Sequence, residues 1–447
     1  MKSIVIIIVF LSSFLFNSCT GVGSSSEKNQ PPSSFSPTNP LPDNTNTDEE
    51  TIRFLEDRVK RDPDDMISYN MLGERYLKRL RETGNLTYLT LAEKAAKESN
   101  RILPPENNVT GLSLMASTRY ASHEFTIARE LGEKLIKLQP DQIFSYQVLG
   151  DALLELGDYE QATSIFKKME KLGDSSPNGK FTLAIRVARI EKLHGNIAKG
   201  ETSLLEALDI ALSMKTPSRE LIAWSSAQLA EHYFSTGDYN KAENYYKESL
   251  KIFPDYFLAI AGLGQVKAAQ GDLDQAIKHY EQAVRLIPDL TFVATLGDLY
   301  KLTGKEQQAQ QQYDLVEQIA KLSTLNGVLY NRSLAIFYAN HDIKLPEAYN
   351  QAEKEYENRK DIYGADALAW TALKVGKLTE AQAAIKDALK LGTKDAKIFY
   401  HAGLIAQAAN DNKAAKTYLE QALSLNPHFD PLQALNAKKI LDQLKTN

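Results

Sequence analysis

Small and large apolar residues recur along this chain at a fixed interval. Between residues 237 and 288 the interval is 34 positions, since Gly237 recurs as Gly271 and Pro254 recurs as Pro288. A fixed period of this length predicts a stack of two-helix units, each of which contacts only its neighbours. Such a stack leaves a long, curved surface exposed, so binding of another molecule is the expected activity.

The interval extends in both directions and predicts ten units. They are expected to begin near Met66, Val109, Ile143, Phe181, Ala223, Phe257, Leu290, Tyr330, Ile362 and Ala396. A small residue near the eighth place of each unit lets its two helices lie close together, and an alanine about twenty places in acts in the same way from the second helix. A bulkier residue there would cost about 1 to 3 kcal/mol through overpacking. Larger apolar residues between the units predict one continuous core.

The regions that flank and interrupt the units complete the expected organisation. In chain order they are a signal segment at 1–19, a disordered tether at 20–48, an N-terminal capping helix at 49–65, units one to four at 66–214, a linker loop at 215–222, units five to ten at 223–430 and a C-terminal capping helix at 431–447. The tether is rich in proline, serine and asparagine and cannot bury enough apolar surface to fold. Pro217 makes the linker loop the candidate for a bend between two halves.

The first residues have the features of an export signal. Lys2 supplies positive charge, and Ile4 to Phe16 form an apolar run too short to span a bilayer as a helix. Cys19, the only cysteine of the chain, follows three residues later. The segment from Leu15 to Cys19 resembles the lipobox of bacterial lipoproteins, although Phe16 stands where that motif usually has leucine. A plain secretory signal with Cys19 near its cleavage site is the alternative.

The lipobox resemblance implies that Cys19 is diacylated and becomes the mature N-terminus. Acyl chains of this kind exceed what stable membrane anchoring requires. The protein is then expected to be exported and held by its lipid on a bacterial membrane without crossing it, on the outer membrane where the host has one. As a flexible coil, the tether would place the folded part about 30 Å from the lipid.

The repeating unit is similar to the tetratricopeptide repeat, a helix-turn-helix unit of 34 residues. The resemblance covers roughly residues 50 to 445. It implies an all-α fold, namely a right-handed α-α superhelix (a solenoid) of about ten repeats closed by the C-terminal helix. In that family places 2, 5, 9 and 12 of the first helix line the concave face. The stretch from Tyr400 to Phe429 also resembles the end of a group of uncharacterised bacterial tetratricopeptide proteins.

Composition and charge argue against several functional classes. The chain has 43% hydrophobic and 24% charged residues, as ordinary globular proteins do, and its net charge of −5 disfavours a nucleic-acid partner, which needs a basic face. The seven histidines lack the i, i+4 pairing of a helical metal site, and no phosphate-binding glycine loop occurs. We therefore expect no enzyme activity, metal, cofactor or small-molecule substrate, and interpret His401 as a hydrogen-bonded structural residue.

The residues at the groove-lining places suggest a partner site. Place nine carries an interrupted series of acidic residues, and places two and twelve add aromatic side chains of the kind that anchor partners. The candidate binding residues are Glu74, Phe144, Asp151, Arg189, Trp224, Glu231, Phe234, Asp298, Tyr363 and Trp370. The family's carboxylate clamp is not reproduced, and acidic residues favour a basic or neutral peptide, or a protein helix, from an envelope complex.

Two functions remain open at this point. The first is a non-catalytic scaffold or adaptor for other proteins of the cell envelope. The second is a polysaccharide-associated or enzyme-regulating lipoprotein in which aromatic residues such as Trp224 stack on sugar rings. Against both stands a third interpretation of the groove residues, a solvated polar face whose aromatic side chains only pack against neighbouring units.

Overall fold

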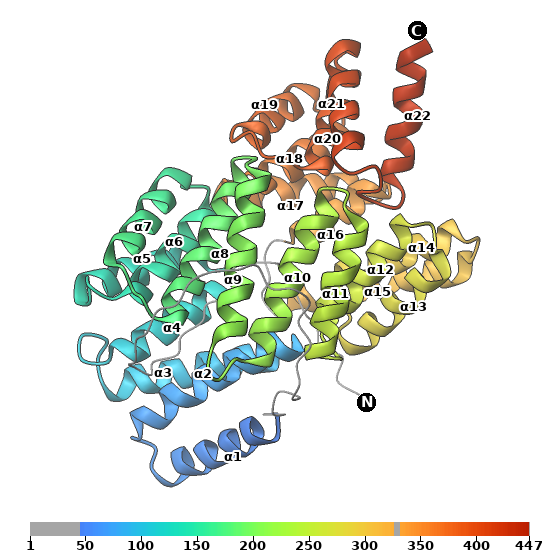
Figure 1. Ribbon diagram of the computed structural model, residues 1–447. Helices are drawn as coiled ribbons and strands as arrows, with labels where there is room; N and C mark the ends of the chain where they lie inside the picture. Colours follow the sequence, from blue (N-terminus) through green and yellow to red (C-terminus); the bar gives the residue numbers. More distant parts are fainter. Residues whose placement is uncertain (1–44, 326–330, 447) are drawn as a thin grey trace.

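The computed structural model describes residues 45–325 and 331–446, and these residues form 22 helices and no strand (Figure 1). Successive helices pair into hairpins, and each hairpin packs on the next one along the chain. We call the first helix of each unit its A helix and the second its B helix. None of the described helices is both long and apolar enough to cross a membrane. The fold is an all-helical repeat solenoid.

Twenty of the helices belong to the ten units, and one further helix lies at each end. The A helices are α2 (Met66–Thr83), α4 (Val109–Ala121), α6 (Ile143–Leu156), α8 (Pro177–Leu193), α10 (Arg219–Ser235), α12 (Phe257–Ala269), α14 (Leu290–Leu302), α16 (Arg332–Asn340), α18 (Ile362–Lys374) and α20 (Ala396–Ala408). The B helices are α3 (Thr87–Ile102), α5 (Phe125–Leu138), α7 (Tyr159–Leu172), α9 (Ile197–Ser213), α11 (Tyr239–Ile252), α13 (Leu273–Leu286), α15 (Glu306–Leu325), α17 (Leu345–Asn358), α19 (Leu378–Leu389) and α21 (Asn412–Leu425). The terminal helices are α1 (Thr45–Arg61) and α22 (Gln433–Thr446).

Most A helices begin at the residue where their unit is expected to begin. The exceptions are α8 and α10, which begin four residues before Phe181 and Ala223, and α16, which begins at Arg332. The early starts of α8 and α10 have a local cause. Ser176 and Ser218 each accept a hydrogen bond on Oγ from the backbone N–H three residues later, and this N-cap starts the helix.

The folded part of the chain begins earlier than its composition predicts. Helix α1 starts at Thr45, inside the expected tether, because Asp48 is buried and accepts a hydrogen bond of 3.0 Å from Arg75 of α2. Lys78 pairs with the same carboxylate. The expected signal segment, Cys19 and most of the tether lie outside the described residues. At the other end, α22 begins at Gln433, within the expected capping segment.

Small residues at the predicted places allow the helices to approach closely. A Cβ atom on Gly73 would lie 2.2 Å from Leu114 Cδ2, and one on Gly150 would lie 2.2 Å from Phe166 Cε1. Ala162 is fully buried at the corresponding place of a B helix. A larger side chain at any of these places would push the helices apart, since the interior has no space to receive it.

The turns inside the hairpins use glycine in the left-handed region. Gly157, Gly237 and Gly271 have φ angles of 83°, 82° and 84°, which other residues adopt only with strain. The aspartate that follows can also start the B helix. Asp238, for example, accepts a hydrogen bond from the N–H of Lys241 and so caps α11.

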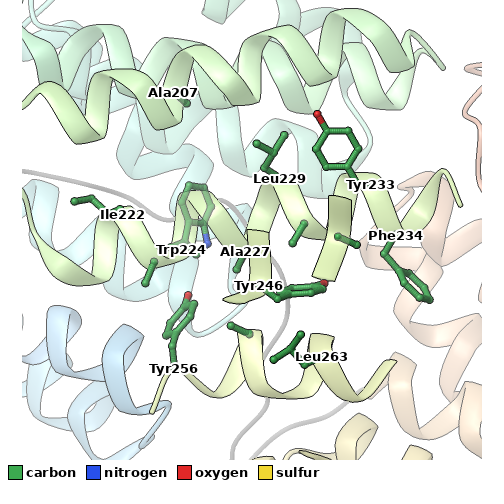
Figure 2. Close-up of a cluster of buried hydrophobic side chains, with 14 of the residues drawn as sticks. Ala207, Ile222, Trp224, Ala227, Leu229, Tyr233, Phe234, Tyr246, Tyr256 and Leu263 are labelled. Atoms are coloured by element: carbon green, nitrogen blue, oxygen red, sulfur yellow. The ribbon is translucent and has the colours of Figure 1, made fainter. Parts of the chain in front are cut away.

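The linker before α10 is well supported on both sides. One hydrophobic core runs from Phe181 of α8 through Ala211 of α9 to Trp224 of α10, and Figure 2 shows the part of it around Trp224. Glu220, in the first turn of α10, is buried, and its Oε1 lies 3.5 Å from Arg81 Nε of α2. The core and this ion pair both bridge the loop, so units four and five pack on each other across it. A bend or weak point at this loop stays a prediction.

The later units return alongside the earlier ones. Three hydrogen bonds join Ile362 to Tyr159, Thr393 to Leu193 and Asn426 to Phe234, pairs that are 203, 200 and 192 positions apart in sequence. In Figure 1, α19 accordingly lies close to the upper end of α8. The solenoid thus completes one superhelical turn, and part of the next turn rests on it.

Candidate functional site

A cleft of about 460 Å³ lies between the A helices of units five to seven and the segment that follows α21. We call the face formed by α10, α12 and α14 the repeat wall, and the face formed by residues 428–435 together with Lys397 the C-terminal wall. The residues of the repeat wall that line the cleft include Ala227, Gln228, Glu231, Leu258, Ala261, Gln265, Ala268, Thr291, Phe292 and Thr295. The two walls come from opposite ends of the second half of the chain.

The repeat wall follows the expected use of the A helix. Places 2, 5, 9 and 12 of unit six are Leu258, Ala261, Gln265 and Ala268, and all four line the cleft. Gly262 lies between them, and a Cβ atom there would lie 2.2 Å from the ring of Tyr246. The missing side chain lets this buried tyrosine pass under the A helix and reach the cleft from behind.

The C-terminal wall is held by its own core and by a helix cap. Phe429 is buried and packs on Tyr400 of α20, with 5.6 Å between the ring centroids. Asp430 accepts hydrogen bonds of 2.9 and 3.0 Å from two backbone N–H groups at the start of α22. Leu435 lines the cleft and is 54% exposed, so the wall presents an apolar side chain to any ligand.

The charged groups of the cleft centre on Glu231. Tyr246 donates a hydrogen bond of 3.0 Å from Oη to Glu231 Oε2, and burial raises the pKa of this carboxyl. Burial lowers the pKa of His428, which is therefore neutral at pH 7. The remaining charged side chains are Asp430 and Lys397. A cation placed beside Glu231 would favour the ionised carboxylate and be held as an ion pair.

The lining suits a peptide segment better than it suits a reacting substrate. Leu258, Phe292 and Leu435 offer apolar surface, while Gln265 and Thr295 offer hydrogen bonds to peptide groups. Within residues 45–325 and 331–446, no group of three or more metal-ligating side chains is placed to hold an ion. The arrangement can bind apolar side chains along its length and one basic side chain at Glu231.

Three of the predicted aromatic anchors are buried. Trp224, Phe234 and Trp370 are 3%, 2% and 3% exposed. Trp224 packs edge-on against Phe181 with 6.2 Å between centroids, and Trp370 stacks on His401 at 4.4 Å. This corrects the prediction that they contact a partner, because neighbouring helices of the same chain already cover their rings.

The two other predicted aromatic residues are partly buried and lie away from the cleft. Phe144 packs against the core between units two and three, and Tyr363 packs against the core that joins units three and four to units eight to ten. His401 has the structural role expected of it, since it is buried and its Nδ1 lies 2.9 Å from Asp366 Oδ1. None of these three residues lines the cleft between the two walls.

The predicted acidic series does not form a continuous free surface. Asp151 is fully buried, and its Oδ2 accepts a hydrogen bond of 2.5 Å from Arg186. Arg189, the basic member of the series, is paired with Glu155. The prediction for Asp151 is corrected accordingly, because its carboxylate is occupied inside the fold and cannot reach a ligand.

The first and last acidic residues of the series, Glu74 and Asp298, are less buried than Asp151. Asp298 accepts a hydrogen bond of 2.8 Å from Tyr313 and lies 2.8 Å from His341 Nε2. Glu74 is exposed and lines a separate, smaller cleft beside Ile67. Among the ten predicted binding residues, Glu231 alone lines the larger cleft.

Sequence reasoning missed the neutral residues of the site. Leu258, Gln265 and Thr291 occupy groove-lining places, but a search for acidic and aromatic side chains selects other residues. Selecting places 2, 5, 9 and 12 of every A helix, whatever their side chains, would have found these residues. No comparable signal points to the C-terminal wall, since its position depends on how far the superhelix has turned.

Comparison with known proteins agrees with this architecture. Three family models described as tetratricopeptide repeat match residues 180–255, residues 233–294, and residues 145–172 and 396–429. A search of curated proteins finds no match. The solved structures that match include the crystal structure of the APC/C hetero-tetramer Cut9-Hcn1, at 13% identity over 90% of this chain and 94% of that chain; its TM-score of 0.34 is too low to carry an argument. The repeat period, the stacked hairpins and the matching family models together show that this chain belongs to the tetratricopeptide repeat family.

Proposed function

We propose that this protein is a non-catalytic scaffold or adaptor that binds a segment of another protein in the cleft between the repeat wall and the C-terminal wall. Tetratricopeptide solenoids offer extended surfaces for protein partners. The observation that supports the proposal is the cleft itself, which has apolar and amide side chains along its length and a carboxyl group at Glu231. A volume of about 460 Å³ receives a few side chains, so the ligand is a short segment and not a whole domain.

The chemistry of the lining defines the segment. Apolar side chains of the partner would lie against Leu258, Phe292 and Leu435, and a lysine or arginine would pair with Glu231. The cleft has two carboxyl groups, at Glu231 and Asp430, against one ammonium group at Lys397. This balance disfavours an acidic segment.

The setting of the proposal is a bacterial cell envelope. We propose that the protein is exported, anchored by lipid on Cys19 and bound to other envelope proteins, and this part of the proposal rests on the N-terminal sequence pattern alone. Incorporation of labelled palmitate tests the anchor: the wild-type chain should be labelled and Cys19→Ser should not. Equal labelling of the two chains would contradict lipidation at Cys19.

The polysaccharide alternative has lost its structural support. It relied on aromatic residues such as Trp224 to stack on sugar rings, and this indole is buried against Phe181. The lining of the cleft offers no exposed tryptophan in its place. We therefore retain the protein scaffold as the single proposed function.

A photo-crosslinking amino acid placed in the cleft tests the proposal directly. Gln265 lines the cleft, whereas Lys278 is exposed on α13, the B helix of the same unit, and serves as the matched control. Crosslinking in cells should join a defined protein to position 265 and not to position 278. The crosslink should weaken when Glu231→Lys is added, because the new cation repels a basic segment.

Two results would count against the site. Crosslinks of equal yield at positions 265 and 278 would show that the cleft is not a preferred contact. An undiminished crosslink in the Glu231→Lys variant would show that this carboxyl plays no part in recognition.

A further inference from the structure

Three hairpin turns of the first superhelical turn rest on three loops of the second. A Cβ atom on Gly157 would lie 2.2 Å from Lys360 O, one on Gly195 would lie 2.3 Å from Gly392 O, and one on Gly237 would lie 3.0 Å from Leu425 O. The contacts at Gly157 and Gly195 therefore need glycine for their close approach as well as for its positive φ, and the contact at Gly237 is tight. We call this line of contacts the seam.

Hydrogen bonds reinforce the seam at each of its three positions. The N–H of Ile362, the first residue of α18, donates to Tyr159 Oη at 2.7 Å, and Thr393 Oγ1 donates to the carbonyl oxygen of Leu193. At the third position Asn426 Nδ2 donates to Phe234 O at 2.8 Å. The first two bonds satisfy backbone groups at helix ends that have no partner inside their own helix, and Phe234 O also accepts a hydrogen bond of 3.0 Å from the N–H of Gly237.

Ion pairing adds to the seam beside its first position. Glu155 of α6 pairs with Arg359 at the end of α17, and the Arg359 guanidinium lies 4.6 Å from the ring centroid of Phe125. Burial would raise the pKa of Glu155, but the charges of Arg189 and Arg359 lower it to about 2. The carboxylate therefore stays ionised, and the pair stays formed, throughout the neutral range.

The third position of the seam lies next to the cleft. Asn426 accepts a hydrogen bond of 2.6 Å on Oδ1 from Tyr239 Oη and a further one of 3.0 Å from the N–H of His428. His428 is the first residue of the C-terminal wall. Asn426 therefore links α11, in the unit that opens the repeat wall, to the beginning of the opposite wall.

The two walls of the cleft are otherwise built on separate cores. Helices α10 and α12 pack in the core that contains Trp224 and Leu263. Phe429 and Ala434 belong instead to the core of α20 to α22, which also includes one residue each of α16 and α18. A change in the distance between the walls is therefore a movement of one superhelical turn against the other. It leaves the packing within each core unchanged.

From this arrangement we propose that the seam is a latch that fixes the width of the cleft, and that release of the Asn426 tie is the movement that opens the C-terminal wall for a ligand. The inference rests on the proposed function of the cleft and describes its regulation. Tyr239 and Asn426 act as positioning residues, since they hold the wall and do not line the cleft. Opening the tie lets the core of α20 to α22, and His428 to Leu435 with it, move away from the repeat wall as one body.

The distance between two spin labels tests the latch without any ligand. Labels at Lys278→Cys on α13 and Lys439→Cys on α22 report the separation of the bodies behind the two walls, since both side chains are exposed. The full-length chain carries Cys19→Ser, which removes its only other cysteine. Pulsed electron resonance then gives the distance distribution. We expect one narrow population in the otherwise unchanged chain.

Three variants decide the outcome. Asn426→Ala removes the tie, Tyr239→Phe removes one of its hydrogen bonds, and Tyr245→Phe removes a phenol from the same helix without touching the seam. We expect a second population at longer distance in the Asn426 and Tyr239 variants and an unchanged distribution in the Tyr245 variant. If Asn426→Ala does not fold, Tyr239→Phe decides alone.

The latch and the proposed function can fail independently. Folded Asn426→Ala and Tyr239→Phe chains with the unchanged distance distribution would overturn the latch, whatever the crosslinking shows. If the otherwise unchanged chain gives no crosslink at position 265, but the Asn426 and Tyr239 variants show a clear second population, the proposed ligand is removed and the latch stays intact. A second population in the Tyr245→Phe control would also overturn the inference, because the loosening would then not depend on the seam.

Discussion

Gly157 and Gly271 form a matched pair of turn residues that differ in their contact with the seam. Both lie in the left-handed region, with φ angles of 83° and 84°, and both precede an aspartate at the start of a B helix. A Cβ atom on Gly157 would lie 2.2 Å from Lys360 O, whereas one on Gly271 would meet no described atom within 4 Å beyond its chain neighbours. Alanine therefore imposes similar backbone strain at both positions and a steric clash at Gly157 alone.

The structure sets the expected size of the two effects. A non-glycine residue in the left-handed region costs about 1 to 2 kcal/mol, which is the expected loss of unfolding free energy for Gly271→Ala. The clash at Gly157 is with a backbone carbonyl, which cannot swing aside as the end of a side chain can, and overpacking of this kind adds about 1 to 3 kcal/mol. Gly157→Ala should therefore lose about 2 to 5 kcal/mol in all.

Urea denaturation followed by helical circular dichroism measures both losses. Long repeat arrays need not unfold in one step, so the midpoint and the slope of the first transition are compared among the wild type and the two variants. A smaller midpoint shift for Gly271→Ala than for Gly157→Ala is expected. Equal shifts would refute the seam contact, because strain in the turn would then account for the whole effect.

Three further predictions follow from buried groups. Glu155→Gln removes the buried carboxylate that pairs with both Arg189 and Arg359, and should lower the unfolding free energy by about 3 to 5 kcal/mol, measured by urea denaturation. Burial alone would lower the pKa of His341, but the hydrogen bond and charge of Asp298 raise it above 6.5. The pair of His341 and Asp298 therefore stabilises the fold fully below pH 6.5, and less as the pH rises through the higher pKa of His341 in the folded state. The stability lost in His341→Gln should accordingly be largest below pH 6.5 and shrink as the pH rises above it, and a constant loss would contradict the assignment. Trp370→Ala should lower the unfolding free energy by about 3 to 5 kcal/mol, because Trp370 is a core residue. A variant that stays stable and only loses the crosslink to the partner would show that Trp370 contacts the partner after all.

The helices and their order were predictable because the signals are local. Most units carry their own small residues, turn glycine and helix caps, and a residue such as Gly150 specifies contact with Phe166 of the same hairpin. The misplaced starts of α8 and α10 are also local, because Ser176 and Ser218 extend these helices beyond the repeat pattern.

The candidate site was predictable only in outline. The groove-lining places were correct for unit six, but the side chains chosen for their charge or aromatic character lie mostly in units where another part of the chain covers them. Trp224, Trp370 and Asp151 are examples of residues whose type suggests a ligand and whose surroundings exclude one. Burial is a property of the assembled superhelix, and the residue type alone does not report it.

The amino-acid pattern by itself is sufficient for the repeat period, the hairpins and the inner face of each unit, because these depend on contacts between neighbours along the chain. The seam and the C-terminal wall depend instead on contacts between residues 192 to 203 positions apart. Small rotations between successive hairpins add up over a whole superhelical turn, and no local pattern encodes their sum. The three-dimensional structure alone therefore decides that the solenoid rests on itself, that Glu231 stays accessible while Asp151 does not, and that a second wall completes the cleft.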